Sequence, residues 1–179
     1  MEIREAVSLI RDAVGHEVGT WADLGAGTGT FTRALAEVVG PGSVIYAVDS
    51  DSRSLRALDE WRRASASRVI PVRADFTAAF DLPELGDELL DGILLANALH
   101  FVRDATSVLT ELVRRVRVGG RVVVVEYDRR AASRWVPYPI PMSRWPELAK
   151  AAGLSDATVV ATRPSMYSGV LYAGKATRT

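Results

Sequence analysis

Segments patterned as strands alternate with segments patterned as amphipathic helices along almost the whole chain, and this alternation restricts the folds it can adopt. The spacing of apolar residues predicts helices from the glycine-rich turn to 39 and over 2–14, 52–66, 104–117 and 144–153, and Gly119 and Gly120 are expected to end the helix over 104–117. Short apolar runs predict strands over 21–24, 43–49, 68–72 and 121–127, and within 88–99. Repeated strand–helix units build a mainly parallel sheet with helices on both faces.

The end of the chain breaks this pattern with two consecutive strand-like runs, 157–163 and 166–176. Their link is too short for a parallel crossover, so we expect an antiparallel hairpin. The apolar run within 88–99 is also compatible with a buried helix, but the turns that bound it favour a strand. With no repeat or linker, the 179 residues predict a single domain over 1–179.

The composition narrows the classes of function. The formal net charge is zero, so no overall basic field attracts nucleic acid or an anionic membrane. The absence of cysteine excludes thiolate nucleophiles and Cys-ligated zinc, and two histidines are too few for a His-rich metal cluster, so we expect no metal. Apolar runs are too short for a membrane span and the charged first residues do not resemble a signal peptide, so we expect a cytoplasmic protein.

Three glycines, Gly25, Gly27 and Gly29, stand between a predicted strand and the helix that follows it. In an open α/β sheet, ligands bind at this carboxyl end of the strands. The dinucleotide fingerprint requires a glycine at position 30, where this chain has Thr30. Asp23 instead precedes the first glycine by two residues, which gives the pattern D-x-G-x-G-x-G. The glycines let the backbone approach a ligand closely, and the nearby acid suits a zwitterion better than a pyrophosphate.

Asp49 ends the second predicted strand, in the segment YAVDSD. A carboxylate there can accept hydrogen bonds from both hydroxyls of a ribose. Enzymes that use NAD share this feature, so it does not distinguish one nucleoside cofactor from another. The alternative is that Asp49 only caps the next helix, for which Ser50 and Asp51 are also suitable residues.

The glycine segment resembles motif I of the class I S-adenosylmethionine-dependent methyltransferases. The resemblance continues through RADFTAAF, DGILLANALHFV and VRVGGRVVVVEY, and so extends along most of the chain. It implies a Rossmann-like, doubly wound sheet of seven strands, mainly parallel, with an antiparallel C-terminal hairpin. It also implies S-adenosylmethionine as the cofactor. The small-molecule branch, including ubiquinone/menaquinone-type enzymes, is the most similar.

The resemblance assigns roles to individual residues. Asp23 would help to hold the ammonium group of the methionine moiety, and Asn97 would lie beside the methionine tail. Asp75 would contact the adenine amino group and the Phe76 backbone would address the ring, although Asp75 is also compatible with a solvated loop acid. The predicted cofactor-binding residues are Asp23, Gly25, Ala26, Gly27, Gly29, Asp49, Ser50, Asp75, Phe76 and Asn97.

Two residues are candidates for catalysis. His100 follows the fourth predicted strand and can exchange a proton near neutral pH. Glu126 ends the fifth strand, where it could bind an acceptor amine or act as a base. Each has a structural alternative: His100 as a residue at a helix entry, and Glu126 as the partner of a nearby arginine.

The acceptor is the least defined part of the prediction. The segment 128–142 is expected to be a loop with three arginines, Trp135 and Tyr138, and such a loop binds a planar or anionic acceptor or simply covers an apolar surface. A small-molecule acceptor is favoured, while nucleic-acid and protein acceptors and a homodimer stay open. The alternative functions are a non-catalytic, S-adenosylmethionine-binding or partner-activating protein and, less favoured, a nicotinamide-dependent oxidoreductase.

Overall fold

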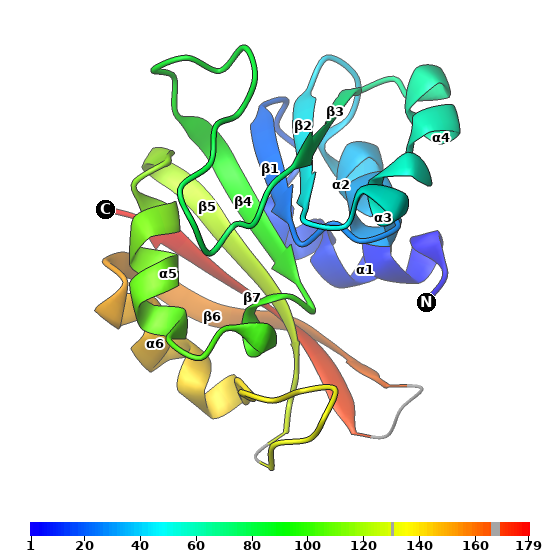
Figure 1. The fold of residues 1–179 in the computed structure, drawn as a ribbon. Helices are drawn as coiled ribbons and strands as arrows, with labels where there is room; N and C mark the ends of the chain where they lie inside the picture. The colour runs from blue at the N-terminus through cyan, green and yellow to red at the C-terminus, as the bar shows by residue number, and fades with distance from the viewer. Residues whose placement is uncertain (130, 166–168) are drawn as a thin grey trace.

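The computed structural model describes residues 1–129, 131–165 and 169–179. These residues form one seven-stranded sheet with the strand order β3-β2-β1-β4-β5-β7-β6. β1 to β5 pair in parallel, and β7 pairs antiparallel with both β5 and β6 (Figure 1). The strands are β1 (Thr20–Leu24), β2 (Val44–Asp49), β3 (Arg68–Arg73), β4 (Leu90–Ala96), β5 (Val116–Tyr127), β6 (Leu154–Pro164) and β7 (Val170–Arg178).

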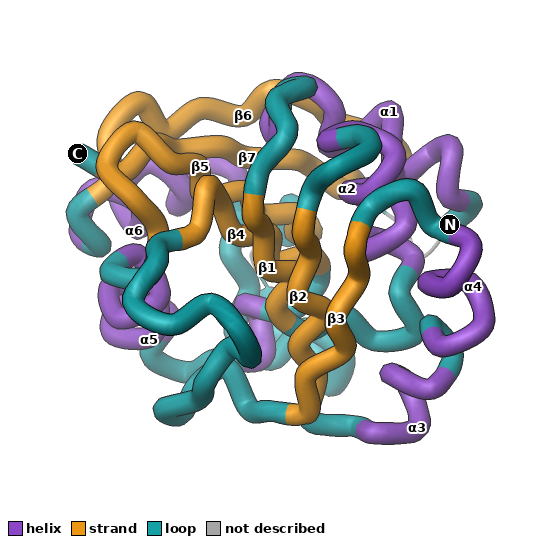
Figure 2. The backbone as a smooth tube through the Cα atoms, turned by 90° about the horizontal axis from the view of Figure 1, so that it is seen from above, coloured by secondary structure: helices purple, strands orange, loops and turns teal. Residues whose placement is uncertain are grey.

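Helices cover both faces of this sheet. α1 (Ile3–Val14) and α2 (Thr30–Val39) pack on one face, and α5 (Ala105–Val113) and α6 (Trp145–Ala151) pack on the other (Figure 1). Seen from above, the short helices α3 (Ser52–Arg56) and α4 (Asp59–Ala64) lie at the β3 end of the sheet (Figure 2). Two 3-10 turns, η1 (Leu99–Phe101) and η2 (Met142–Arg144), precede α5 and α6. The predicted fold class is confirmed.

The two faces of the sheet bury alternate side chains of the same strands. In β5, Val122 and Val124 point into the core under α5 and α6, while Val123 and Val125 point into the core under α1 and α2. A strand covered on both faces is apolar at successive positions, which explains the unbroken valine run. None of the helices formed by the described residues has the length and apolar character needed to cross a membrane.

β1 lies between β2 and β4, so the chain winds outward from β1 in both directions. A crevice forms outside the carboxyl ends of the strands where the winding direction reverses, and ligands of doubly wound sheets bind there. The glycine loop follows β1, and Asn97 follows β4. The fold therefore brings both segments to this reversal point.

The prediction for 104–117 is wrong at its end. α5 stops at Val113, and Gly119 and Gly120 lie inside β5 instead of ending a helix. The pairing of β4 with β5 shifts register between Leu90 and Gly92, and a Cβ on Gly120 would lie 2.8 Å from the Asp91 carbonyl oxygen. The glycine therefore permits a close approach of two strands at an irregularity of the sheet.

Other boundaries differ by smaller amounts. The helix predicted over 52–66 is divided into α3 and α4, because the chain turns at 57–58 and buries Leu58. β6 begins at Leu154, before the predicted start at 157. The antiparallel hairpin is confirmed, although the start predicted for its second strand, 166–168, lies outside the described residues.

Candidate functional site

The glycine loop is tied to the end of β2. The backbone N–H groups of Gly25 and Ala26 both donate to the Val48 carbonyl oxygen, at 2.8 and 3.0 Å. Gly25 has φ +81°, and a Cβ there would lie 2.7 Å from the Cβ of Ala98. Only glycine combines this backbone conformation with so close an approach. The loop is therefore fixed beside the residues that follow β4.

Glycine is needed at position 29 for a different structural reason. It is the N-cap of α2 with φ +87°, and a Cβ there would overlap the side chain of Leu58. Gly29 lines neither of the cavities described below, whereas Gly25 and Gly27 do. The third glycine of the motif accommodates a packed leucine from the α3–α4 turn.

Asp49 is held by backbone donors on both sides. Its Oδ2 accepts a hydrogen bond from Gly27 N, and its Oδ1 accepts one from Asp51 N, both at 2.8 Å. The N-cap of α3 is Asp51, which accepts from Arg53 N at 2.9 Å, so the capping role belongs to Asp51. A carboxylate has about four acceptor positions, so Asp49 retains capacity for a ligand.

A cavity of about 450 Å³, here called the Asp75 cavity, opens beside Asp49. Thr77 donates to Asp75 Oδ1 from its backbone N and its hydroxyl, at 2.9 and 2.7 Å, and these bonds lower the pKa of Asp75. The structure thus brings six of the predicted cofactor-binding residues together around this cavity. They are Gly25, Asp49, Ser50, Asp75, Phe76 and Asn97.

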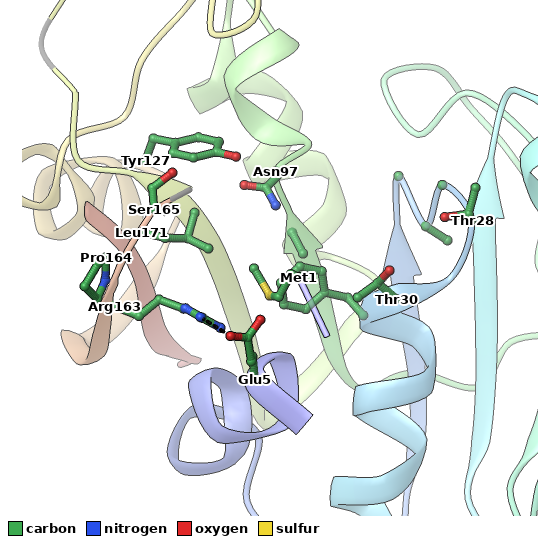
Figure 3. A pocket seen from close by; sticks show the side chains of 15 residues that line it. Met1, Glu5, Thr28, Thr30, Asn97, Tyr127, Arg163, Pro164, Ser165 and Leu171 are labelled. Carbon is green, nitrogen blue, oxygen red and sulfur yellow. Dashed lines mark hydrogen bonds and ion pairs between the residues drawn. The ribbon is translucent and has the colours of Figure 1, made fainter. Parts of the chain in front are cut away.

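A second cavity of about 360 Å³, here called the hairpin cavity, lies between the glycine loop, the N-terminal segment and the C-terminal strands (Figure 3). Gly25 and Asn97 line both cavities, so the two adjoin at these residues. Asn97 has φ +54°, and its buried Oδ1 has no hydrogen-bond partner among the described residues. Such an unsatisfied acceptor is costly, and a donor from a bound ligand would satisfy it.

The far wall of the hairpin cavity was not predicted from the sequence. It is formed by α1 and the C-terminal strands, with Met1, Glu5, Arg163, Pro164 and Leu171. The N-terminal residues of this wall lie far from the C-terminal ones in the chain, with 158 positions between Glu5 and Arg163. Nothing local in either segment distinguishes these residues from other surface positions. The pairing of β5, β7 and β6 brings them together.

Asp23 is fully buried below the glycine loop and lines neither cavity. Its Oδ2 accepts a hydrogen bond from the Thr32 hydroxyl at 2.6 Å, while Oδ1 has no partner among the described residues. Burial raises the pKa of Asp23 to about 7, and the Thr32 bond opposes this shift. The predicted contact with a ligand ammonium therefore requires a water or a local movement.

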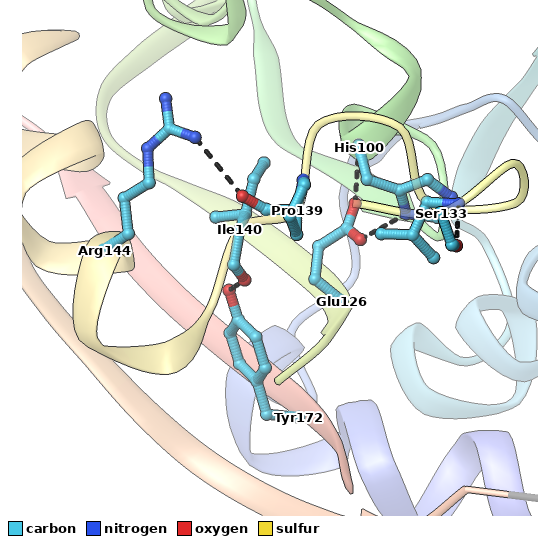
Figure 4. Close-up of polar contacts among 8 residues, drawn as sticks. His100, Glu126, Ser133, Pro139, Ile140, Arg144 and Tyr172 are labelled. Atoms are coloured by element: carbon cyan, nitrogen blue, oxygen red, sulfur yellow. Dashed lines mark hydrogen bonds and ion pairs between the residues drawn. The ribbon is translucent and has the colours of Figure 1, made fainter. Parts of the chain in front are cut away.

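His100 and Glu126 form a buried pair (Figure 4). Their side chains are 2% and 0% exposed, and His100 Nδ1 lies 2.5 Å from Glu126 Oε2. Glu126 Oε1 also accepts from the His100 backbone N at 3.2 Å. Burial raises the pKa of Glu126, and the bond from His100 partly offsets the rise. The partner of Glu126 is thus a histidine, not the arginine considered as the alternative.

Neither member of this pair lines the Asp75 cavity or the hairpin cavity. The His100 ring contacts Phe101, at 4.4 Å between centroids, and lies 6.1 Å from the Tyr127 ring. Phe101 lines the Asp75 cavity and Tyr127 lines the hairpin cavity. The pair therefore lies behind the aromatic side chains that separate it from both spaces.

The loop predicted over 128–142 is partly packed against the body of the protein. Val136 and Ile140 are buried, and the Tyr138 backbone N donates to the His100 carbonyl oxygen at 3.0 Å. Trp135 is 75% exposed and lies under the Arg134 guanidinium. Arg130, one of the three arginines of this loop, lies outside the described residues. The loop covers apolar surface and presents two aromatic side chains, Trp135 and Tyr138, to solvent.

A family model described as "Methyltransferase domain" matches residues 22–124, which include the glycine loop, Asp49, Asp75 and Asn97. The chain belongs to the class I S-adenosylmethionine-dependent methyltransferase family. A demethylmenaquinone methyltransferase from Thermobifida fusca is 36% identical to it over 127 residues, which are 70% of this chain and 50% of that protein. One from Clavibacter sepedonicus is 32% identical over 145 residues, 81% of this chain and 54% of that protein.

Solved structures place this methyltransferase family member in the same fold. A Burkholderia thailandensis 1,6-didemethyltoxoflavin-N1-methyltransferase, solved with S-adenosylhomocysteine, has a TM-score of 0.75 and 22% identity, covering 99% of this chain and 78% of that one. The Synechocystis magnesium protoporphyrin IX methyltransferase, with bound SAM, has a TM-score of 0.69 and 14% identity, with the same two coverages, 99% and 78%. The chain spans about half the length of the demethylmenaquinone methyltransferases it matches.

Proposed function

We propose that this chain binds S-adenosylmethionine and transfers its methyl group to a small molecule. The observation that carries the proposal is the arrangement of two cavities that adjoin at Gly25 and Asn97. One cavity is lined by the residues predicted to hold a nucleoside, and the other leaves space for an acceptor. Family membership supports the same chemistry.

The residues of the Asp75 cavity fit an adenosine group. Asp49 is fixed by two backbone donors and keeps acceptor positions free for ribose hydroxyls. Phe76 supplies an apolar surface for the adenine ring beside Gly25, which lines the same cavity. Asn97 Oδ1, buried and unpartnered among the described residues, would accept from the ammonium of the methionine moiety. We propose supporting roles at this end for Asp23, Ala26, Gly27, Gly29, Ser50 and Asp75.

S-adenosylmethionine supplies an already activated methyl group when it is bound. The contribution of the chain is then to align the acceptor and to exclude water. Tyr127, Phe31 and Leu171 give the hairpin cavity apolar walls next to Asn97. Such walls desolvate an acceptor atom without any catalytic group.

We propose that His100 accepts a proton from the acceptor and that Glu126 orients the imidazole and stabilises its charged form. The 2.5 Å contact between them supports this pairing of a base with a carboxylate. His100 lines neither cavity, so this role requires Phe101 or Tyr127 to move. The burial of the pair also favours a second candidate function, a protein that binds S-adenosylmethionine without turnover.

The acceptor class rests on the relatives. The Thermobifida fusca and Clavibacter sepedonicus proteins are named for demethylmenaquinone, and the Burkholderia protein for 1,6-didemethyltoxoflavin. All are small molecules, and we propose a small-molecule acceptor here as well, with nucleic-acid and protein acceptors less favoured. We further propose a cytoplasmic location and keep a homodimer as a hypothesis.

Calorimetric titration with S-adenosylmethionine, S-adenosylhomocysteine and NADH tests the cofactor. We expect both sulfur ligands to bind wild-type protein and to lose at least about tenfold in affinity in Asp49→Ala, which removes charge-assisted hydrogen bonds. Asp51→Ala, which removes only a helix cap, is the matched control. Binding of NADH alone would support an oxidoreductase instead. An acceptor screen with radiolabelled methyl groups then separates an enzyme from a non-catalytic binder.

A further inference from the structure

The charged residues of the hairpin cavity are Glu5 of α1 and Arg163 of β6. Arg163 Nη2 donates to Glu5 Oε1 at 2.5 Å, and the two side chains are 26% and 40% exposed. Figure 3 shows the pair at the wall of the cavity, away from Thr28 of the glycine loop. The family match, residues 22–124, includes neither residue.

Glu5 and Arg163 differ in how many of their hydrogen-bonding groups remain available to a ligand. Glu5 Oε1 is used by Arg163, and Glu5 Oε2 accepts from the Glu2 backbone N at 2.9 Å in the capping box of α1. These bonds hold the pKa of Glu5 below its ordinary value. A guanidinium has five N–H donors, and Arg163 uses one of them within the described part of the chain. Arg163 therefore keeps N–H donors available to a ligand at this wall, whereas both carboxylate oxygens of Glu5 are already engaged.

Arg163 is also the only basic side chain among the described residues that line the hairpin cavity. The rest of the wall is largely apolar, with Met1, Phe31, Tyr127 and Leu171. An apolar space with one fork of N–H donors suits a ligand with an apolar body and one carboxylate.

The position of Arg163 in the sheet separates it from the cofactor end. β6 is the edge strand, and β4, β5 and β7 lie between it and β1. At about 4.8 Å between neighbouring strands, β6 is roughly 19 Å from β1 along the sheet. The cofactor binds at β1 and β4 in the proposed function, so the opposite wall belongs to the acceptor.

We propose that Arg163 recognises a carboxylate on the methyl acceptor, with Glu5 holding the guanidinium in position. The acceptor class is then a small acid with an apolar, ring-sized body. This inference rests on the proposed function and deepens it, because it names the acceptor class for the same site.

The test compares acids with their methyl esters. The probes are 4-hydroxybenzoate, salicylate and indole-3-acetate with the corresponding esters, titrated by ligand-observed NMR with and without saturating S-adenosylhomocysteine. We expect acids to bind wild-type protein at least about tenfold more tightly than esters, since a hydrogen bond between charged groups is lost in the ester. In Arg163→Gln the ratio of acid to ester affinity should fall to about one. In Arg163→Lys, which keeps the positive charge, part of the preference for acids should remain.

Two further variants serve as controls. Arg68→Gln breaks an exposed ion pair with Glu84 outside the cavity and should leave the ratio unchanged. Glu5→Gln leaves the Arg163 guanidinium in place but removes the ion pair that positions it. This variant should lower the ratio of acid to ester affinity less than Arg163→Gln does. Exposed ion pairs contribute little to stability, so all of these variants should fold.

Equal affinity for acids and esters in wild-type protein, including no binding of either, overturns the inference. So does a preference for acids that survives in Arg163→Gln. A third contrary outcome is weaker binding of S-adenosylhomocysteine but not of decarboxylated S-adenosylmethionine in Arg163→Gln, which would assign the guanidinium to the cofactor carboxylate. Failure of the proposed function is distinguishable, because wild-type protein would then not bind S-adenosylhomocysteine at all.

Discussion

Asp23 gives the protein a stability that depends on pH. Its folded-state pKa, about 7, is raised from an ordinary 3.8, so the folded state disfavours the charged form. The raised pKa makes the free energy of unfolding fall as pH rises between these two values. We expect a loss of about 2–3 kcal/mol from this group between pH 5 and pH 8.

Asp23→Asn should remove that part of the pH dependence while keeping an acceptor for the Thr32 hydroxyl. Urea unfolding of both proteins at pH 5 and pH 8 measures it, and the variant should be the more stable protein at pH 8. The same pH dependence in both proteins would mean that Asp23 stays charged in the fold.

At Gly25 the backbone lies very close to the segment that follows β4. Gly25→Ala forces a Cβ to 2.7 Å from that of Ala98 at φ +81°. We expect a loss of at least about 2 kcal/mol in stability and of about tenfold in S-adenosylhomocysteine affinity. Gly86→Ala is the control, because Gly86 has φ +59° but open space around its Cβ position. Equal losses in both variants would show that the backbone conformation alone matters.

The buried pair of His100 and Glu126 makes a third residue-scale prediction. Glu126→Gln replaces the carboxyl group that His100 contacts at 2.5 Å in a fully buried position. We expect stability to fall by about 3 kcal/mol, as when a buried pair loses one member. Glu111→Gln, which breaks an exposed pair with Arg114, should change stability by less than about 1 kcal/mol. Methyl transfer that persists in a folded Glu126→Gln protein would remove Glu126 from the mechanism.

At the scale of elements, sequence patterns located the segments whose constraints are local. The β1–loop–α2 unit was predictable because Gly25 and Gly27 have positive φ angles, which favour glycine. A local conformation of this kind leaves its mark in the sequence as a glycine. Gly119 and Gly120 misled the prediction, since the same residue type ends a helix or permits close strands. The break at Leu58 depends on the space above Gly29, which exists only in the folded chain.

The candidate site also has one part that the sequence predicts and one part that depends on the folded chain. Six residues of the Asp75 cavity lie at or just after strand ends or in the glycine loop, and the sequence predicts all six of them. The wall of the hairpin cavity joins Glu5 to Arg163, which are 158 positions apart, and depends on the pairing of β5, β7 and β6. No periodicity or motif in either segment specifies that contact.

The loop between β5 and α6 is held by Tyr172 of β7, whose hydroxyl donates to the Ile140 carbonyl oxygen at 2.8 Å. Tyr172→Phe leaves that carbonyl buried without its donor, which costs about 1 kcal/mol. Trypsin should then cleave after the exposed Arg134 about fivefold faster, because the loop opens more often. Tyr46→Phe removes a similar bond to the Pro83 carbonyl oxygen and should not change cleavage at Arg134. Unchanged cleavage in Tyr172→Phe would show that the loop is anchored elsewhere.

At the scale of the whole molecule, the two cores share one sheet. Trp21 lies in the core under α1 and α2, and Trp145 in the core under α5 and α6. Adjacent residues of β5 enter opposite cores, so neither face can be lost while the strand stays ordered. The single domain predicted for 1–179 therefore requires one cooperative transition.

Urea unfolding of Trp21→Phe and Trp145→Phe, followed by fluorescence and far-UV circular dichroism, tests that requirement. Each variant lacks one core tryptophan, on one face of the sheet. In both variants the fluorescence and circular dichroism signals should nevertheless share one midpoint. Saturation with S-adenosylhomocysteine at about a hundred times its dissociation constant should raise the unfolding free energy by about 2.7 kcal/mol, equally for both signals. Two midpoints, or a ligand effect on one signal only, would mean that the faces unfold separately and that the site belongs to one of them.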